Sequence, residues 1–330
     1  MMTKTKNLSL ATVAGLIALA GCATQPAPHQ RTAALRPLPP RPYASAPRQS
    51  TLSAVETAPT DRSLQIQAAA FESFMRHARG IDPAFSSPAD VAQALQTGAR
   101  HEPRELEAGM IAFAALAALQ EPRFVAAVRA EARPGELARR LAADPQAALA
   151  LPGAEAAGAR ASGALYAQGS GLTGDGEKVK HAAYSVQHQA WSTAKVPDAA
   201  GRLSRVKRLS TESYRPAGED AAQLQLALAQ NTHRPGGATP VVARGVALAA
   251  LSVLGEQRQG QGLMSEPAAG SCLHMAKLNL YQCLASAGPH YEDIFCLGQH
   301  AMIDPGQCVV EATKAPGPRQ VAVTRASYRP

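Results

Sequence analysis

Residues 271–308, SCLHMAKLNLYQCLASAGPHYEDIFCLGQHAMIDPGQC, decide the fold of the C-terminal part of this chain. They predict two helices, over 271–287 and 290–303, because Gly288-Pro289 between them is typical of a helix stop followed by a helix breaker. Asp304-Pro305-Gly306 is expected to turn the chain after the second helix. We therefore expect a helical hairpin over 266–311.

The four cysteines of this hairpin, Cys272, Cys283, Cys296 and Cys308, allow three disulfide connectivities. In an antiparallel hairpin, residues at one level have a constant sum of residue numbers, and this sum is 580 for Cys272 with Cys308 and 579 for Cys283 with Cys296. A Cys272–Cys283 bridge would join residues about 16 Å apart on one helix, whereas a disulfide needs Cα atoms roughly 4.4 to 6.8 Å apart. The crossed pairing would require the helices to slide by about three turns. The nested pairing is therefore the prediction.

Two other interpretations of the same cysteines are weaker. A zinc site with His274, His290 or His300 would need ligands two to four residues apart in pairs, and no two of these cysteines are that close. The layout also resembles the twin-cysteine helical hairpin proteins. The ten, twelve and eleven residues that separate these cysteines depart from that family's motif, so the resemblance carries no function to this chain.

Upstream of the hairpin, from Asp61 onward, apolar residues recur every three or four residues, which is the spacing of an amphipathic helix. Ser87 is expected to cap a helix that has Pro88 at its first position, and the pairs Glu102-Pro103, Glu121-Pro122 and Arg133-Pro134 are likewise typical of helix starts. These starts predict an N-terminal helical domain over 61–152. Its expected core includes five phenylalanines: Phe71, Phe74, Phe85, Phe113 and Phe124.

A second helical region is expected over 153–265. It contains an Ala/Gly-rich helix over 154–168, a glycine-rich turn, a helix over 177–193, a basic amphipathic stretch over 202–209 and apolar helices over 221–230 and 241–254. The last of these is too short to span a bilayer and is expected to be a buried central helix. The overall prediction is an all-α fold, a helical bundle body with a disulfide-stapled hairpin.

The first twenty-two residues predict export. Lys4 and Lys6 precede an apolar run over 8–20, which is typical of a secretory signal, and the run ends in Leu19-Ala20-Gly21-Cys22. This ending resembles the lipobox of bacterial lipoproteins. The resemblance implies that residues 1–21 are a signal peptide and that Cys22 becomes the lipidated, acylated N-terminus, carrying diacylglyceryl and palmitate-type chains.

The segments at the two ends of the mature chain are expected to be disordered. Residues 22–60 are rich in proline and arginine, and proline-rich segments form semi-extended tethers that rise about 3.1 Å per residue. Residues 312–330 form a basic tail. A wall-penetrating role for the tether is an alternative to a passive spacer.

The lipobox and the charge together indicate location and partners. Ala23 follows Cys22, which by resemblance to other lipoproteins implies the outer membrane, facing the periplasm. The net charge of +8 becomes +6 without Lys4 and Lys6, and a basic exported protein meets envelope anions rather than nucleic acid. Peptidoglycan or an envelope protein is the expected partner, and Trp191, Arg205 and Arg208 are candidate contact residues.

Two motifs resemble those of enzymes, but the sequence around each of them lacks the other features that the enzyme motif requires. Gly169-Ser170-Gly171-Leu172-Thr173-Gly174 matches a dinucleotide-binding pattern but follows no strand, so a flexible connector is expected. Phe71-Glu72-Ser73 resembles the Glu-Ser start of lytic transglycosylases, yet the Gly-Leu-Met-Gln loop of that family is missing, and Glu72 is expected to be a solvated helix residue.

We expect no catalytic residue, metal or cofactor. The leading function is a structural or interaction role in the cell envelope. The alternatives are a peptidoglycan-cleaving enzyme with an acidic general acid and an accessory subunit of a secretion or surface-attachment complex.

Overall fold

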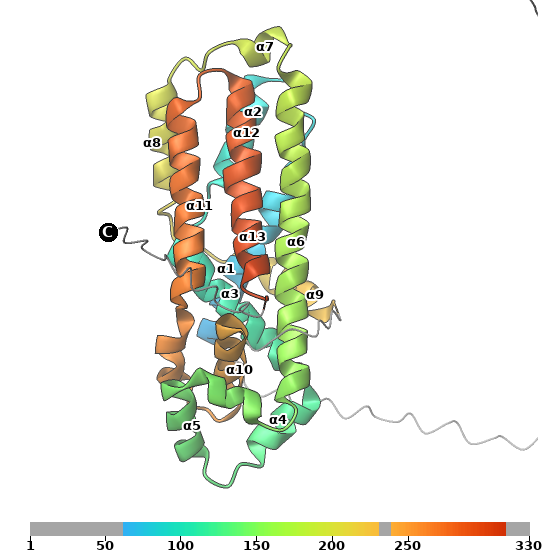
Figure 1. Ribbon diagram of the computed structural model, residues 1–330, viewed down its shortest axis with the longest axis vertical. Helices are drawn as coiled ribbons and strands as arrows, with labels where there is room; N and C mark the ends of the chain where they lie inside the picture. The colour runs from blue at the N-terminus through green and yellow to red at the C-terminus, as the bar shows by residue number, and fades with distance from the viewer. Residues whose placement is uncertain (1–61, 231–238, 315–330) are drawn as a thin grey trace, which may run out of the picture. The chain divides into compact units, whose positions relative to one another are not determined.

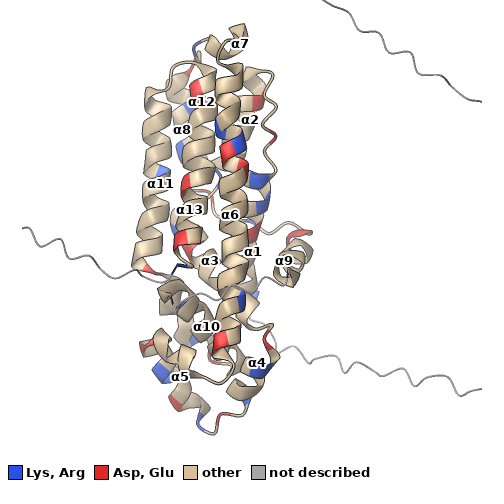
Figure 2. Cartoon of the chain, turned by 45° about the vertical axis from the view of Figure 1, so that its right-hand side comes forward, with Lys and Arg blue, Asp and Glu red and all other residues tan. Residues whose placement is uncertain are grey.

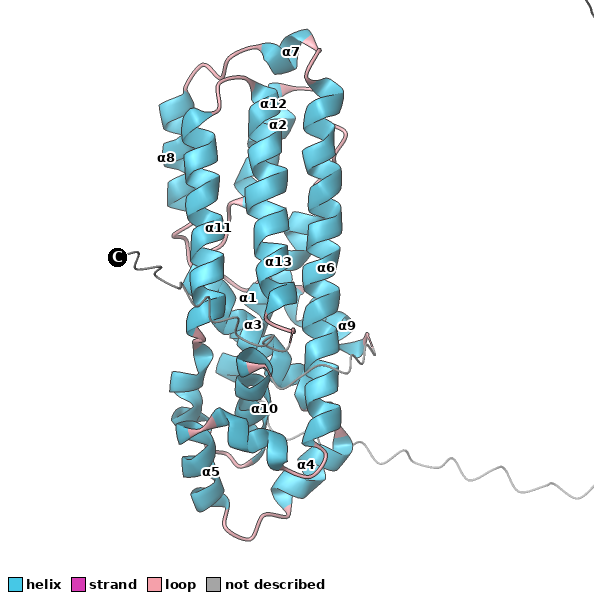
Figure 3. Ribbon diagram, in the orientation of Figure 1, coloured by secondary structure: helices cyan, strands magenta, loops and turns pink. Residues whose placement is uncertain are grey.

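The computed structural model describes residues 62–230 and 239–314 of the 330-residue chain. Within these ranges the chain is helical and forms no strand, apart from one isolated bridge between Lys195 and Pro289 (Figure 3). The predicted all-α class is therefore confirmed. The signal segment 1–21, Cys22, the tether 22–60 and residues 315–330 of the tail lie outside the described residues.

Figure 1 shows how the helices of the described ranges are arranged. In chain order they are α1 (Arg62–Arg79), α2 (Pro88–Gly98), α3 (Pro103–Ala118), α4 (Pro122–Arg129), α5 (Pro134–Ala143), the 3₁₀ helix η1 (Pro145–Ala150), α6 (Ala154–Val186), α7 (Ala190–Thr193), α8 (Ala199–Leu209), α9 (Asp220–Ala229), α10 (Pro240–Val253), the 3₁₀ helix η2 (Gln257–Met264), α11 (Pro267–Ser286), α12 (His290–Cys296), the π-helix η3 (Leu297–Ile303) and α13 (Asp304–Glu311).

Proline marks the start of four consecutive helices, as the sequence predicts. Helices α2 to α5 each begin at the proline that the sequence marks as a helix start. Proline suits this position because its missing N–H would have no partner inside the helix and its φ is already helical. At α2 and α3 the cap is complete, since Ser87 Oγ accepts from Asp90 N at 3.3 Å and Glu102 Oε2 accepts from Glu105 N at 2.8 Å.

One hydrophobic core draws on all three expected helical segments. Helix α3 lies at its centre, buried continuously from Gly109 to Ala118, and packs against α1, α6, α10 and α11. The five expected core phenylalanines are buried, and the rings of Phe71 and Phe113 lie 5.3 Å apart. Helix α10 is buried along most of its length, which confirms its prediction as a buried helix.

The expected glycine-rich turn is wrong, because α6 runs without a break from Ala154 to Val186. The glycines serve close packing of this helix instead. A Cβ at Gly169 would lie 2.7 Å from the backbone oxygen of Gly306, and a Cβ at Gly176 would lie 2.8 Å from Cβ of Met302. The expected helix over 177–193 is also wrong, since α6 ends at Val186 and α7 is a separate short helix.

The C-terminal hairpin carries the nested disulfides. Cys272 is bonded to Cys308 and Cys283 to Cys296, with Cα atoms 5.7 and 5.6 Å apart, so the predicted pairing is confirmed. The expected turn at Asp304-Pro305-Gly306 is wrong. These residues begin α13, which continues α12 and η3 in helical conformation and carries Cys308 itself.

The π-helix explains how each cysteine of α11 lies level with its partner cysteine, although the two pairs of cysteines along the chain are spaced differently. The cysteines of α11 are 11 residues apart, whereas Cys296 and Cys308 are 12 apart. In two uninterrupted α-helices the extra residue would rotate one cysteine by about 100° away from its partner. A π turn takes up one additional residue without moving the helix face. Leu297–Ile303 is that turn, and it lies between the two bridges.

In the described ranges, no single helix is both long and apolar enough to cross a membrane. One bent pair, α3 with α4, satisfies the length and composition criteria together, with an angle of 89° between the two helices.

Candidate functional site

A cavity of about 780 Å³ opens between α1, the C-terminal half of α2, the start of α3 and the loop 211–219 that joins α8 to α9. We refer to it as the α1–α3 cavity. Its buried wall includes Phe74 and Leu106, and its exposed rim includes Gln93, Gln96 and Arg100. The volume lies in the range that small-molecule sites occupy.

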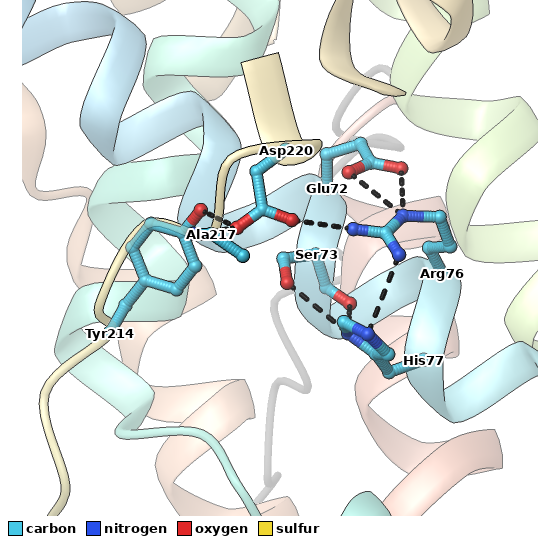
Figure 4. Close-up of polar contacts among 7 residues, drawn as sticks. All are labelled: Glu72, Ser73, Arg76, His77, Tyr214, Ala217 and Asp220. Atoms are coloured by element: carbon cyan, nitrogen blue, oxygen red, sulfur yellow. Dashed lines mark hydrogen bonds and ion pairs between the residues drawn. The ribbon is translucent and has the colours of Figure 1, made fainter. Parts of the chain in front are cut away.

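Asp220 fastens the loop 211–219 over this cavity (Figure 4). Its carboxylate accepts from Arg76 Nη2 at 2.7 Å, from the Tyr214 hydroxyl at 2.5 Å and from Ala217 N at 2.8 Å. The backbone N–H of Tyr214 donates to both oxygens of Glu105 at 3.0 Å. The loop is therefore bound directly to α3 and α9, and Asp220 links it to Arg76 on α1.

The charges of this network are fixed by its hydrogen bonds. Burial raises the pKa of Asp220, but the donors Tyr214, Ala217 and Arg76 outweigh burial, so the pKa lies below its ordinary value. Burial and the hydrogen bond to Asp220 raise the pKa of Tyr214. Asp220 is thus an anion and Tyr214 a neutral donor near neutral pH.

Glu72 is buried, so the expectation of a solvated helix residue is wrong. Arg76 Nε lies 3.1 Å from Glu72 Oε1, and the same guanidinium binds Asp220 (Figure 4). Burial raises the pKa of Glu72 against the lowering effect of Arg76. Glu72 is absent from the lining of the α1–α3 cavity, whereas its neighbour Ser73 is part of it. The geometry places Glu72 in a buried ion pair outside the lining of this cavity.

His101 and Lys277 form a second buried pair at the same cavity. Lys277 Nζ donates to Ala99 O at 3.0 Å and lies 3.2 Å from His101 Nδ1. His101 lines the cavity, is 5% exposed, and its ring lies 4.3 Å from that of Phe74. Burial and the nearby Lys277 hold the pKa of His101 well below its ordinary value, and burial lowers the pKa of Lys277 as well.

The basic stretch on α8 divides into one buried cation and several exposed ones. Arg202 is buried and donates to Asp293 at 2.5 Å and to the backbone oxygens of Leu284 and Ala287. It therefore does not belong to a solvated basic face. Burial raises the pKa of Asp293 to about 6 against the opposing effect of Arg202.

The three candidate contact residues lie apart from the α1–α3 cavity. Trp191 on α7 is partly buried against the core, and its Nε1 donates to Gln189 Oε1 at 2.5 Å. Arg205 and Arg208 are exposed on α8, with Arg205 3.4 Å from Asp198. Figure 2 shows basic and acidic residues interspersed along the visible helices. Whether these three residues contact a partner stays a prediction.

The cysteine-zinc interpretation is excluded, because all four cysteines of the hairpin are consumed in disulfides. In the part of the chain that the structure describes, no group of three His, Cys, Asp or Glu side chains is arranged to hold a metal ion.

Comparison with protein-family models, with curated proteins and with solved structures finds no match for this chain. The site is therefore interpreted from its own residues.

Proposed function

We propose that this chain is a lipid-anchored lipoprotein on the periplasmic face of the bacterial outer membrane, with a helical body that binds peptidoglycan or an envelope protein. The observation that carries the proposal is Leu19-Ala20-Gly21-Cys22 at the end of a short apolar run, because this arrangement places a cysteine where lipoproteins are cleaved and acylated. Several acyl chains anchor a protein effectively permanently.

Two features of the body support an exported, binding role. The bridges Cys272–Cys308 and Cys283–Cys296 are of the kind that persists in oxidising compartments such as the periplasm. The α1–α3 cavity offers a preformed place for a ligand, with its loop fastened by Asp220. Glu72 does not line that cavity, which favours binding over acid-catalysed cleavage of peptidoglycan.

Fractionation of cells that express the natural chain or Cys22→Ser tests the anchor. We expect the natural protein in the outer-membrane fraction and the Cys22→Ser protein released from membranes, because the thiol that receives the lipid is gone. Membrane association that is unchanged in Cys22→Ser contradicts the proposal. Ser45→Ala, within the tether, is the matched control and should remain in the membrane fraction.

Incubation of the purified protein with peptidoglycan separates binding from cleavage. Sedimentation of the protein with intact peptidoglycan supports the binding role. Release of sugar fragments that is lost in Glu72→Gln would establish the enzyme instead. Co-purification with a large assembly and no affinity for peptidoglycan would favour the accessory-subunit alternative.

A further inference from the structure

The outer surface of α8 carries positive charges that acidic side chains balance only in part. Arg205, Lys207 and Arg208 are exposed, and residues 199–211 contain no Asp or Glu. Arg205 lies 3.4 Å from the exposed Asp198, which precedes the helix. The guanidinium of Arg208 and the ammonium of Lys207 form no ion pair within the described ranges. The helix therefore presents a net positive charge to solvent.

Helix α11 extends this surface without adding an acid. It packs beside α8 (Figure 1), and it has no Asp or Glu over Pro267–Ser286. Lys207 Nζ lies 5.6 Å from the ring centroid of Tyr281, at the boundary between the two helices. On α6, by contrast, Lys178 and Lys180 pair with acids of their own helix. We refer to the exposed side chains of 199–209 and 267–286 as the α8–α11 face.

The α8–α11 face lacks the apolar residues that a bilayer would require. Amphipathic helices bind membranes by inserting an apolar face as well as by charge. On α8, Val206 and Leu209 are buried and Leu203 packs against the core. Met275 is the one large hydrophobic side chain that α11 exposes. A membrane could hold this face by charge alone.

The cations also point in different directions around α8. At about 100° per residue, Arg205 and Lys207 lie about 160° apart around the helix axis. A flat surface that meets one of them faces away from the other, whereas a flexible chain can follow the curve of the helix. No residue of α8 or α11 lines the α1–α3 cavity, so this face is separate from that site. The partner that fits is a flexible anionic polymer.

Arginine at two of the three positions favours carboxylates as the anionic groups. The guanidinium offers a planar fork of N–H donors that matches the two oxygens of a carboxylate. Arg205 and Arg208 are three residues apart on one helix, which places their Cβ atoms roughly 5 to 6 Å apart. Each exposed ionic contact changes an affinity by at most about fivefold. The polymer must therefore offer several carboxylates at once.

We propose that the α8–α11 face binds the peptide stems of peptidoglycan through their carboxylates. Arg205 and Arg208 bind the carboxylates, and Lys207 adds positive charge at the boundary with α11. This inference deepens the proposed binding role and rests on it for the choice of polymer, because the stem peptides of peptidoglycan are flexible and carry free carboxylates at regular intervals.

Co-sedimentation of the purified full chain with isolated peptidoglycan at low salt tests the face. Arg205→Gln/Lys207→Gln/Arg208→Gln removes its three exposed charges, and we expect the affinity to fall at least about fivefold. Arg205→Lys/Arg208→Lys keeps the charges and should retain most of the affinity. A thermal melt establishes that each variant folds, since all three side chains are exposed.

A matched variant separates this face from the net charge of the protein. Arg123→Gln/Arg139→Gln/Arg140→Gln removes three exposed cations from α4 and α5, which lie at the other end of the bundle from α8 (Figure 1). It changes the net charge by the same amount and should alter the affinity by less than about twofold. An equal loss in the two triple variants would overturn the proposal, because net charge alone would then explain binding.

Chemical modification of the polymer tests the carboxylates. Peptidoglycan whose carboxylates are converted to amides should bind the natural chain as weakly as untreated peptidoglycan binds the α8 triple variant. Unchanged binding of amidated peptidoglycan would overturn the assignment to carboxylates. Vesicles of phosphatidylglycerol test the membrane alternative, and vesicle binding that is lost in the α8 triple variant while peptidoglycan binding is unchanged would overturn the assignment to peptidoglycan.

The results distinguish this face from the proposed function as a whole. Peptidoglycan binding that is the same in the natural chain and the α8 triple variant would overturn the face and leave the binding role in place. No binding of peptidoglycan by the natural chain would contradict peptidoglycan as the partner in both proposals. Neither result depends on the lipid at Cys22, because the purified chain is compared with its own variants.

Discussion

Arg202 places a positive charge inside the packing between α8 and the C-terminal hairpin, where it binds Asp293 and two backbone oxygens. Removal of one partner from a buried ion pair leaves the other charge uncompensated, which typically costs about 3 to 5 kcal/mol. We predict that Arg202→Ala lowers the free energy of unfolding by this amount. Urea denaturation followed by circular dichroism measures the change.

Arg205→Ala is the control for that prediction. Arg205 lies three residues further along the same helix, is exposed and pairs with an exposed Asp198 at 3.4 Å. Exposed pairs contribute about 0 to 1 kcal/mol because water screens them. Similar losses for the two variants would mean that Arg202 is not buried as described.

The lowered pKa of Asp220 leads us to expect that the stability of the folded protein depends on pH. Its pKa in the folded protein lies below the ordinary 3.8, because hydrogen bonds from Tyr214 and Ala217 and the charge of Arg76 outweigh burial. An acid with a lowered folded pKa stabilises the protein above its unfolded pKa, and this contribution is lost as the pH falls through the folded pKa. We predict that stability falls on acidification below about pH 4.

The matched variant for this effect is Asp220→Asn. It should be less stable than the natural protein at neutral pH, and the difference between the two should shrink as the pH falls below about 4. Thermal melts across that range measure both proteins. A stability difference that is independent of pH would show that the charge of Asp220 is not what fastens the loop.

At the scale of the helix, α6 shows where sequence patterns succeed and fail. The proline starts of α2 to α5 were predictable, because the preference of proline for the first helical position is a local property. The continuity of α6 was not predictable, because a glycine-rich segment is typical of a turn. The reason for its glycines is the close packing of α13 and η3 against them, which the sequence does not show. The π turn likewise has no local signature. Only the one-residue difference between the cysteine spacings points to it.

At two glycines of α6, substitution by alanine is expected to change the free energy of unfolding in opposite directions. A Cβ at Gly169 would meet the backbone oxygen of Gly306 at 2.7 Å, whereas a Cβ at Gly174 meets nothing within 4 Å. Gly169→Ala should lower the free energy of unfolding by about 1 to 3 kcal/mol through overpacking. Gly174→Ala should raise it by about 0.5 to 1 kcal/mol, since alanine favours a helix. Chemical denaturation of both variants checks the signs, and equal effects would contradict the close packing of α6 against α13.

At the scale of the molecule, the cavity could not be predicted from the sequence. Arg76 and Asp220 are 144 residues apart, and His101 and Lys277 are 176 apart, so no local motif joins them. The disulfide pairing was predictable at long range because hairpin geometry relates residue numbers directly to levels along the helices. Glu72 could be singled out from its neighbours, but its burial depends on Arg76 and Asp220.

The lipid anchor at Cys22 is the central proposal of this account, and mass spectrometry of the N-terminal peptide tests it most directly. The protein is isolated from the cells that make it and digested, and the first peptide is sequenced. We predict a peptide that begins at Cys22 and carries diacylglyceryl on its sulfur, with a mass increment that is absent from Cys22→Ser. A mature chain that begins at another residue, or an unmodified Cys22, would contradict the lipoprotein assignment.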